Sequence, residues 1–194
     1  MGRFLLGIIV GIILVPAIVL AWFHWGHVAV AVADPPLPQE RLIVHVPLDA
    51  RIDRELIKTP PIQPDEGNLV AGAQIYRDQC ASCHGLRGKP SQFGAHMYPD
   101  APPLWEPHHH GPQTVVFGVS DDPPGETYWK VANGIRLSGM PSFNDILTDN
   151  QMWQVSILLA NADKPLPPSA IDLLQGQAPA ATAPSATSTP VTSK

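Results

Sequence analysis

A run of residues without any charged side chain, from Phe4 to Phe23, constrains this chain more than any other feature. At about 1.5 Å of rise per residue, a helix of this length spans the roughly 30 Å hydrocarbon core of a bilayer. Arg3 precedes the run and no Lys or Arg follows until Arg41, a distribution that predicts the amino terminus in the cytoplasm. The sequence therefore predicts a single-pass anchor over residues 1–33 of a cytoplasmic-membrane protein, with lipid contact through residues 4–23 and the remaining chain on the periplasmic side.

A cleaved secretory signal is the alternative interpretation of the same segment. Ala31-Val32-Ala33 has the small-residue pattern that a signal peptidase accepts, and cleavage near Ala33 would release a soluble periplasmic protein. We favour the uncleaved anchor because the apolar run is longer than the roughly 7 to 15 residues of a signal core. Both interpretations export the body of the chain.

The remaining sequence divides into three parts by composition. Residues 34–64 contain seven prolines, so we expect an extended arm, with a short edge strand at Leu42 to Val46. From about Gly176 the chain consists mainly of Ala, Thr, Ser and Pro with almost no charge, and we predict a disordered low-complexity tail over residues 166–194. Residues 65–165 lie between them and form the predicted domain.

Three helices are predicted within residues 65–165. The first follows Asp65 as N-cap and runs from Leu69 to Cys80, and the second runs from Gly125 to Asn133. The third begins after Thr148, which forms a capping box with Gln151. This pattern predicts an all-α fold, in which three short helices make a poor core unless an apolar group fills its centre.

The charge and the cysteine count exclude two classes of protein. Residues 65–165 hold six basic and eleven acidic side chains, a balance of −5, and the whole chain also carries −5. A nucleic-acid binder needs clustered Lys and Arg, so we expect no such partner. Two cysteines cannot build the disulfide framework of a small secreted domain.

Those two cysteines belong to the motif Cys80-Ala81-Ser82-Cys83-His84. Cys-x-x-Cys-His is the attachment pattern of c-type haem. The two thiols can add to the two vinyl groups of one porphyrin, and the adjacent imidazole is then held at the iron as its proximal ligand. We therefore predict one covalently bound haem c, attached through Cys80 and Cys83 and ligated by His84.

Two other chemistries use the same residues. Cys80 and Cys83 could form a dithiol-disulfide oxidoreductase pair, but the predicted helix precedes the pair and no βαβ pattern is visible. A zinc site could combine the cysteines with two histidines, but the spacing from His84 to His108 is irregular for zinc. Both alternatives are disfavoured.

Over residues 65–165 the sequence resembles the small c-type cytochromes with one haem. The resemblance implies an all-α domain wrapped around covalent haem, electron transfer as its activity, and haem attachment outside the cytoplasmic membrane. The long stretch between residues 85 and 125 departs from the compact family pattern. The segments that carry the resemblance are the helix into CASCHG, Ala101–Leu104, Tyr128–Gly134, Gly139-Met140-Pro141 and the closing helix around Trp153.

The opposite face of the iron needs a sixth ligand, for which we predict Met140. Its thioether lies in a loop between Gly139 and Pro141, and a soft sulfur ligand raises the reduction potential. His96, Met97 and the run from His108 to His110 are alternative ligands. We otherwise interpret the run His108-His109-His110 as a solvated loop.

Further residues are predicted to surround the haem. The Pro-rich segment matches the place where the family presents a carbonyl to the proximal histidine, so Pro102 is predicted to orient His84. Hydrogen bonds to the haem propionates are expected from one or more of four side chains with polar hydrogens. These are Tyr128, Trp129, Arg136 and Trp105.

The sequence thus predicts a one-electron carrier rather than an enzyme, because it offers no separate acid/base cluster for a substrate reaction. The carrier would be tethered to the membrane, or would be the cytochrome subunit of a respiratory or dehydrogenase complex. Redox proteins are its expected partners, and an extended arm would let the domain search for those bound to the membrane.

Overall fold

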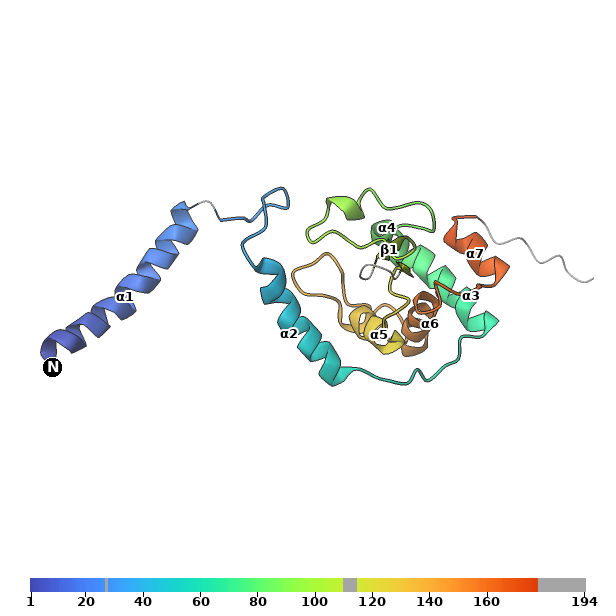
Figure 1. Cartoon of the computed structure of the whole chain (residues 1–194), viewed down its shortest axis with the longest axis horizontal. Coiled ribbons are helices and arrows are strands. Elements are labelled where there is room, and N and C mark those ends of the chain that lie inside the picture. Colours follow the sequence, from blue (N-terminus) through green and yellow to red (C-terminus); the bar gives the residue numbers. More distant parts are fainter. Residues whose placement is uncertain (27, 110–114, 178–194) are drawn as a thin grey trace, which may run out of the picture. The chain divides into compact units, whose positions relative to one another are not determined.

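The computed structural model describes residues 1–26, 28–109 and 115–177, and the chain divides into two compact units, Met1–Pro47 and Leu48–Lys194. Helices dominate both units (Figure 1), which confirms the predicted all-α fold class. Strands β1 (Pro107–His109) and β2 (Val115–Phe117) pair antiparallel, with His108 opposite Val116.

The first unit contains helix α1, Gly2–Trp25, which carries Pro16 in its interior. No residue of α1 is buried within the protein, and its length and apolarity are sufficient to cross a membrane. Within the described part of the chain it is the one helix of this kind. This agrees with the apolar segment recognised in the sequence.

Helix α2, Glu40–Glu55, occupies most of the segment predicted as an extended arm, so the expected edge strand at Leu42–Val46 is wrong. The prolines of this segment flank the helix, apart from Pro47 inside it. The carboxylate of Glu40 accepts a hydrogen bond from the backbone N–H of Leu37 at 2.8 Å, which stabilises the helix start. Proline content alone was therefore a misleading signal.

The second half of α2 and the residues after it belong to the second unit. Ile52 is only 3% exposed, and Trp129 Nε1 donates a hydrogen bond to Glu55 Oε2 at 2.8 Å. The carbonyl of Ile57 lies so close to Gly125 that any side chain at position 125 would overlap it. Residues 48–64 thus pack on the helical domain and are not a free arm.

The segment that leads to the cysteine motif is one continuous helical stretch. Helix α3, Glu66–Ile75, begins at the predicted N-cap, where the Asp65 carboxylate accepts from Asn68 N at 2.9 Å. A π-helical turn, η1 (Tyr76–Cys80), follows, and then the short helix α4 (Ala81–His84). The predicted helix up to Cys80 is confirmed, with a change of helical type at Tyr76.

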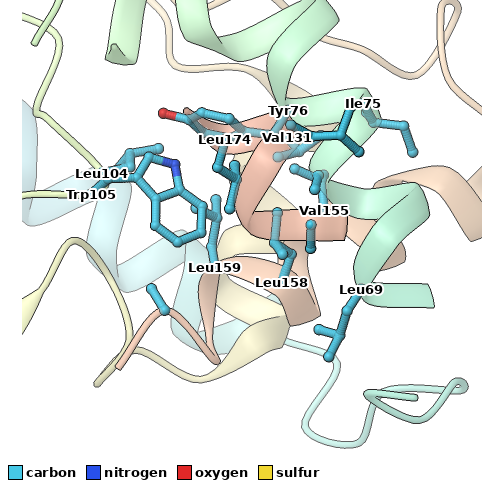
Figure 2. Close-up of a cluster of buried hydrophobic side chains, with 14 of the residues drawn as sticks. Leu69, Ile75, Tyr76, Leu104, Trp105, Val131, Val155, Leu158, Leu159 and Leu174 are labelled. Atoms are coloured by element: carbon cyan, nitrogen blue, oxygen red, sulfur yellow. The ribbon is translucent and has the colours of Figure 1, made fainter. Parts of the chain in front are cut away.

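The other two predicted helices are also present. Helix α5 spans Pro124–Asn133 and ends at Gly134, whose φ of 67° suits glycine. Helix α6 spans Asp149–Leu159, and Thr148 and Gln151 form the expected capping box. Helix α6 crosses α3 closely, since a Cβ at Gly72 would overlap the carbonyl of Gln154. Figure 2 shows the resulting core, with Leu158 and Leu159 of α6 at its centre.

Helix α7, Pro168–Leu174, corrects the expectation of a disordered tail from residue 166 onward. Leu166, Ala170, Leu173 and Leu174 are all buried, and Leu174 O accepts a hydrogen bond from Arg87 N at 3.0 Å. Within α7, Leu173 and Leu174 follow Ala170 by three and four residues, so that one helix face joins the core. The domain therefore extends to at least this helix, and residues 178–194 of the predicted tail lie outside the described residues.

Candidate functional site

The two cysteines and the histidine of the motif lie on adjacent helical turns. Cys80 ends η1, and Cys83 and His84 belong to α4. All three side chains are half-buried, and the two cysteines form no disulfide with each other. One short segment thus presents two sulfurs and an imidazole together, as covalent haem attachment requires.

His84 is oriented by a backbone carbonyl. Its Nδ1–H donates a hydrogen bond to Pro102 O at 2.8 Å, the contact predicted from the sequence. Burial lowers the pKa of His84, although the hydrogen bond to Pro102 acts in the opposite direction. The imidazole is therefore neutral at neutral pH, and with Nδ1 engaged, Nε2 is the nitrogen left to ligate a metal.

The residues after His84 fold back onto the motif and fix it. Tyr76 donates its hydroxyl proton to Gly85 O at 2.7 Å, and Ser91 Oγ donates to Ser82 O at 2.6 Å. Gly94 packs so closely on the carbonyl of Cys83 that a Cβ at position 94 would overlap it. We call residues 82–102 the proximal frame, because they hold His84 and its carbonyl acceptor.

The thiol of Cys80 is poorly suited to redox chemistry as a free nucleophile. Burial, followed by the neighbouring Cys83, raises its pKa to about 12. Reactive cysteines instead have a lowered pKa, because the thiolate is the reacting species. This environment argues against a dithiol-disulfide oxidoreductase.

Met140 lies in a loop that is held by its own hydrogen bonds. Ile135 N donates to Met140 O at 3.2 Å, and Met140 N donates to Ser138 Oγ at 3.1 Å. Gly134 approaches the backbone of Pro141, where an added Cβ would lie 2.6 Å from the carbonyl carbon. We call residues 134–143 the distal loop; it presents a half-buried Met140 from the end of α5.

Two of the side chains predicted to contact haem propionates use their polar hydrogens elsewhere. Tyr128 donates to Asp149 and stacks on Trp153 with ring centroids 4.2 Å apart. Trp129 donates to Glu55, as described above. Both residues therefore take part in helix packing in this structure, and their expected contact with haem stays a prediction. Arg136 is exposed on the distal loop, and its contact with haem stays a prediction.

Trp105 is different, because its donor has no partner among the described residues. The side chain is 4% exposed, and Nε1 makes no hydrogen bond. Its ring meets Tyr76 edge to face, with centroids 5.5 Å apart (Figure 2). A buried N–H without an acceptor is costly, so the site fits a bound group that brings an acceptor, such as a haem propionate.

The histidine candidates for other metal chemistry do not assemble. His96 is exposed and donates Nδ1–H to Gln92 O at 2.8 Å, and His108 and His109 are exposed in β1. His110 lies outside the described residues. Among residues 1–26, 28–109 and 115–177, no three His, Cys, Asp or Glu side chains form a group that could hold a metal ion. The zinc alternative thus has no structural basis in this part of the chain.

Comparison with known proteins finds similarity over the same segment. Residues 67–157 match the family described as cytochrome C oxidase, cbb3-type, subunit III. Two curated relatives are the Cbb3-type cytochrome c oxidase subunits FixP of Rhizobium meliloti (strain 1021) and of Sinorhizobium medicae (strain WSM419). Each is 35% identical over 104 residues, which is 53% of this chain and 32% of the relative. The chain thus spans about a third of the length of these relatives.

Among solved structures, the Kuenenia stuttgartiensis reducing HAO-like protein complex Kustc0457/Kustc0458 is similar with a TM-score of 0.38. It is 22% identical, and the match covers 53% of this chain and 46% of that chain. The family match and the two curated relatives confirm the resemblance expected from the sequence.

Proposed function

We propose that this chain, whose residues 67–157 form a c-type cytochrome domain, is a membrane-tethered one-electron carrier that works as the cytochrome subunit of a respiratory complex. The observation that carries the proposal is the motif geometry. Cys80 and Cys83 flank one turn, and His84 directly after them is oriented by Pro102 O with Nε2 left for a metal.

The residues that would hold the haem are drawn from the proximal frame, the distal loop and the core. Cys80 and Cys83 would form the thioether bonds, and His84 would ligate the iron through Nε2. Met140 would supply the sixth ligand, and Trp105 Nε1 would donate to a propionate. Bound haem supplies reversible one-electron chemistry at its iron.

The protein's own contribution is to hold these groups in fixed positions in a partly buried site. The Tyr76, Ser91 and Pro102 contacts fix the proximal frame, and the Ser138 and Ile135 contacts fix the distal loop. Such fixed ligands change little between two oxidation states of a metal, which favours rapid electron exchange over substrate chemistry. We therefore assign the chain as a carrier and not as an enzyme in its own right.

The first unit supports the proposed membrane tether, and the charge distribution of the sequence supports its sidedness. Helix α1 would cross the cytoplasmic membrane, with residues 4–23 in contact with lipid and the cytochrome domain on the periplasmic side. We propose residues 1–33 as the anchor. The domain itself would comprise the packed residues from Leu48 through α7, rather than residues 65–165 alone. Oxidoreductase proteins of the same membrane are the proposed partners, because the curated relatives are oxidase subunits.

The test is the colour and covalency of the mature protein. The full chain should be produced with haem maturation active, purified from membranes, and examined by visible spectroscopy and by haem staining after denaturing electrophoresis. We expect stained protein, with staining lost in a Cys80→Ser, Cys83→Ser double variant. Colourless wild-type protein whose two thiols both react with an alkylating reagent would refute the proposal.

A further inference from the structure

One side chain connects the proximal frame to the distal loop. Met97 is half-buried, and its terminal methyl group lies directly over Gly139. A Cβ at position 139 would overlap Met97 Cε and would lie 3.5 Å from its sulfur. Met97 therefore occupies the space above Gly139, which leaves no room for a side chain at this position. Gly139 directly precedes Met140 in the sequence.

The position of Met97 is set by the proximal frame. Met97 N and Ala101 N both donate to Gly94 O, at 3.2 Å and 3.0 Å, and Gly94 in turn packs on the carbonyl of Cys83. Met97 is thus fixed at its backbone to the segment that contains Cys83 and His84. Only its side chain extends beyond that segment.

The distal loop is held from its own side of the site. Phe143 N donates to Val131 O at 3.0 Å, and Ser142 Oγ donates to Ala132 O at 2.6 Å, so the end of the loop is fixed to α5. Within the loop, Ile135 N donates to Met140 O and Met140 N donates to Ser138 Oγ. The contact of Met97 with Gly139 joins this part of the loop to the opposite segment of the site. The strength of that tie depends on apolar contact, which a flexible thioether makes well.

We propose that Met97 is a positioning residue that holds the distal loop against the proximal frame and so keeps Met140 at the iron. The inference rests on the proposed function, in which Met140 is the sixth ligand. Loss of the Met97 side chain lets the loop move away, so an added ligand replaces Met140 more easily. Met97 acts through packing and does not itself ligate.

The test titrates the ferric, haem-loaded protein and its variants with imidazole. Imidazole binding is measured as the loss of the weak sulfur-to-iron charge-transfer band. For Met97→Ala we expect imidazole to bind about tenfold more tightly, which is about 1.4 kcal/mol. Met97→Leu should restore wild-type affinity, because leucine fills nearly the same volume without a sulfur. Phe93→Ala is the matched control: Phe93 lies in the same segment and is 67% exposed, and we expect no change.

Gly139→Ala gives an independent approach from the other side of the contact. The new methyl group must displace the end of the Met97 side chain, so this variant should also bind imidazole more tightly. In a Met97→Ala background the same change should add little, since coupled residues are not additive. Gly139→Ala alone keeps the test decisive if Met97→Ala fails to retain haem.

The outcomes separate this inference from the ligand assignment. If Met140→Ala abolishes the band, but Met97→Ala and Gly139→Ala titrate like Phe93→Ala, the positioning role is wrong and the ligand assignment stands. If Met97→Leu abolishes the band and Met140→Ala preserves it, Met97 is the ligand. The positioning role of Met97 and the assignment of Met140 as sixth ligand are then both wrong. If neither methionine variant changes the band, the assignment of Met140 in the proposed function is wrong.

Discussion

The packing of residues 48–64 on the domain makes a quantitative prediction through Ile52. This side chain is 3% exposed on α2, and burial of an isoleucine contributes about 2 kcal/mol. We expect Ile52→Ala to weaken docking of the segment by that amount, without altering α3, α5 or α6. The fraction of molecules with the segment detached should then rise about 30-fold.

Limited proteolysis measures this fraction directly. Lys58 lies within the segment and is exposed to trypsin, but cleavage after it requires local detachment, because a protease accepts only a locally unfolded backbone. When detachment is faster than cleavage, the cleavage rate follows its equilibrium, and we expect Ile52→Ala to be cut roughly 30 times faster than wild type. Val46→Ala is the matched control, because Val46 lies on the same helix and is 57% exposed.

A rate within threefold of wild type would refute the reasoning, since it would mean that Ile52 does not hold the segment. An equal acceleration in Val46→Ala would also refute it, because the effect would then come from helix stability and not from docking. The absorption spectrum of the haem should be unchanged in both variants, which shows that the cytochrome domain has remained folded.

Three further outcomes follow from the site and the core. Met140→Ala should abolish the sulfur-to-iron charge-transfer band and lower the midpoint potential in a redox titration, and an unchanged band would contradict ligation by Met140. Trp105→Phe should keep the ring packing against Tyr76 but remove the N–H that has no hydrogen-bond acceptor. We expect a lower midpoint potential with a nearly unchanged melting temperature, and an unchanged potential would argue against a propionate contact. Truncation after Pro165 removes Leu173 and Leu174 from the core and should destabilise the domain by about 4 kcal/mol or more in denaturant unfolding, whereas truncation after Gln177 should change little; equal stability of the two truncations would show that α7 does not support the core.

Local signals explain which helices could be predicted from the sequence. Asp65 and Thr148 cap α3 and α6 through residues three positions away, and Gly134 ends α5 with a positive φ. The Cys80 to His84 motif is equally local, since its chemistry lies within five consecutive residues. These features do not depend on the rest of the fold, so their interpretation carried over to the structure.

The missed features depend on partners far away in the sequence. Helix α2 is stabilised by Ile52 and by the contact of Glu55 with Trp129, 74 residues later. Helix α7 is short, and its burial against the core is what favours it. The partners of Tyr128 and Trp129 and the contact of Met97 with Gly139 are likewise tertiary, and a residue pattern alone does not specify them.

The π-helical turn at Tyr76–Cys80 has a consequence for the spacing of the whole site. Each residue of a regular helix turns the chain by about 100°, so the wider turn changes the direction in which the following cysteine points. Deleting one residue here, such as Asp78 or Gln79, would restore a regular helix and rotate both sulfurs and the imidazole together relative to α3. The number of residues between α3 and Cys80 therefore sets the direction in which both sulfurs and the imidazole point relative to α3.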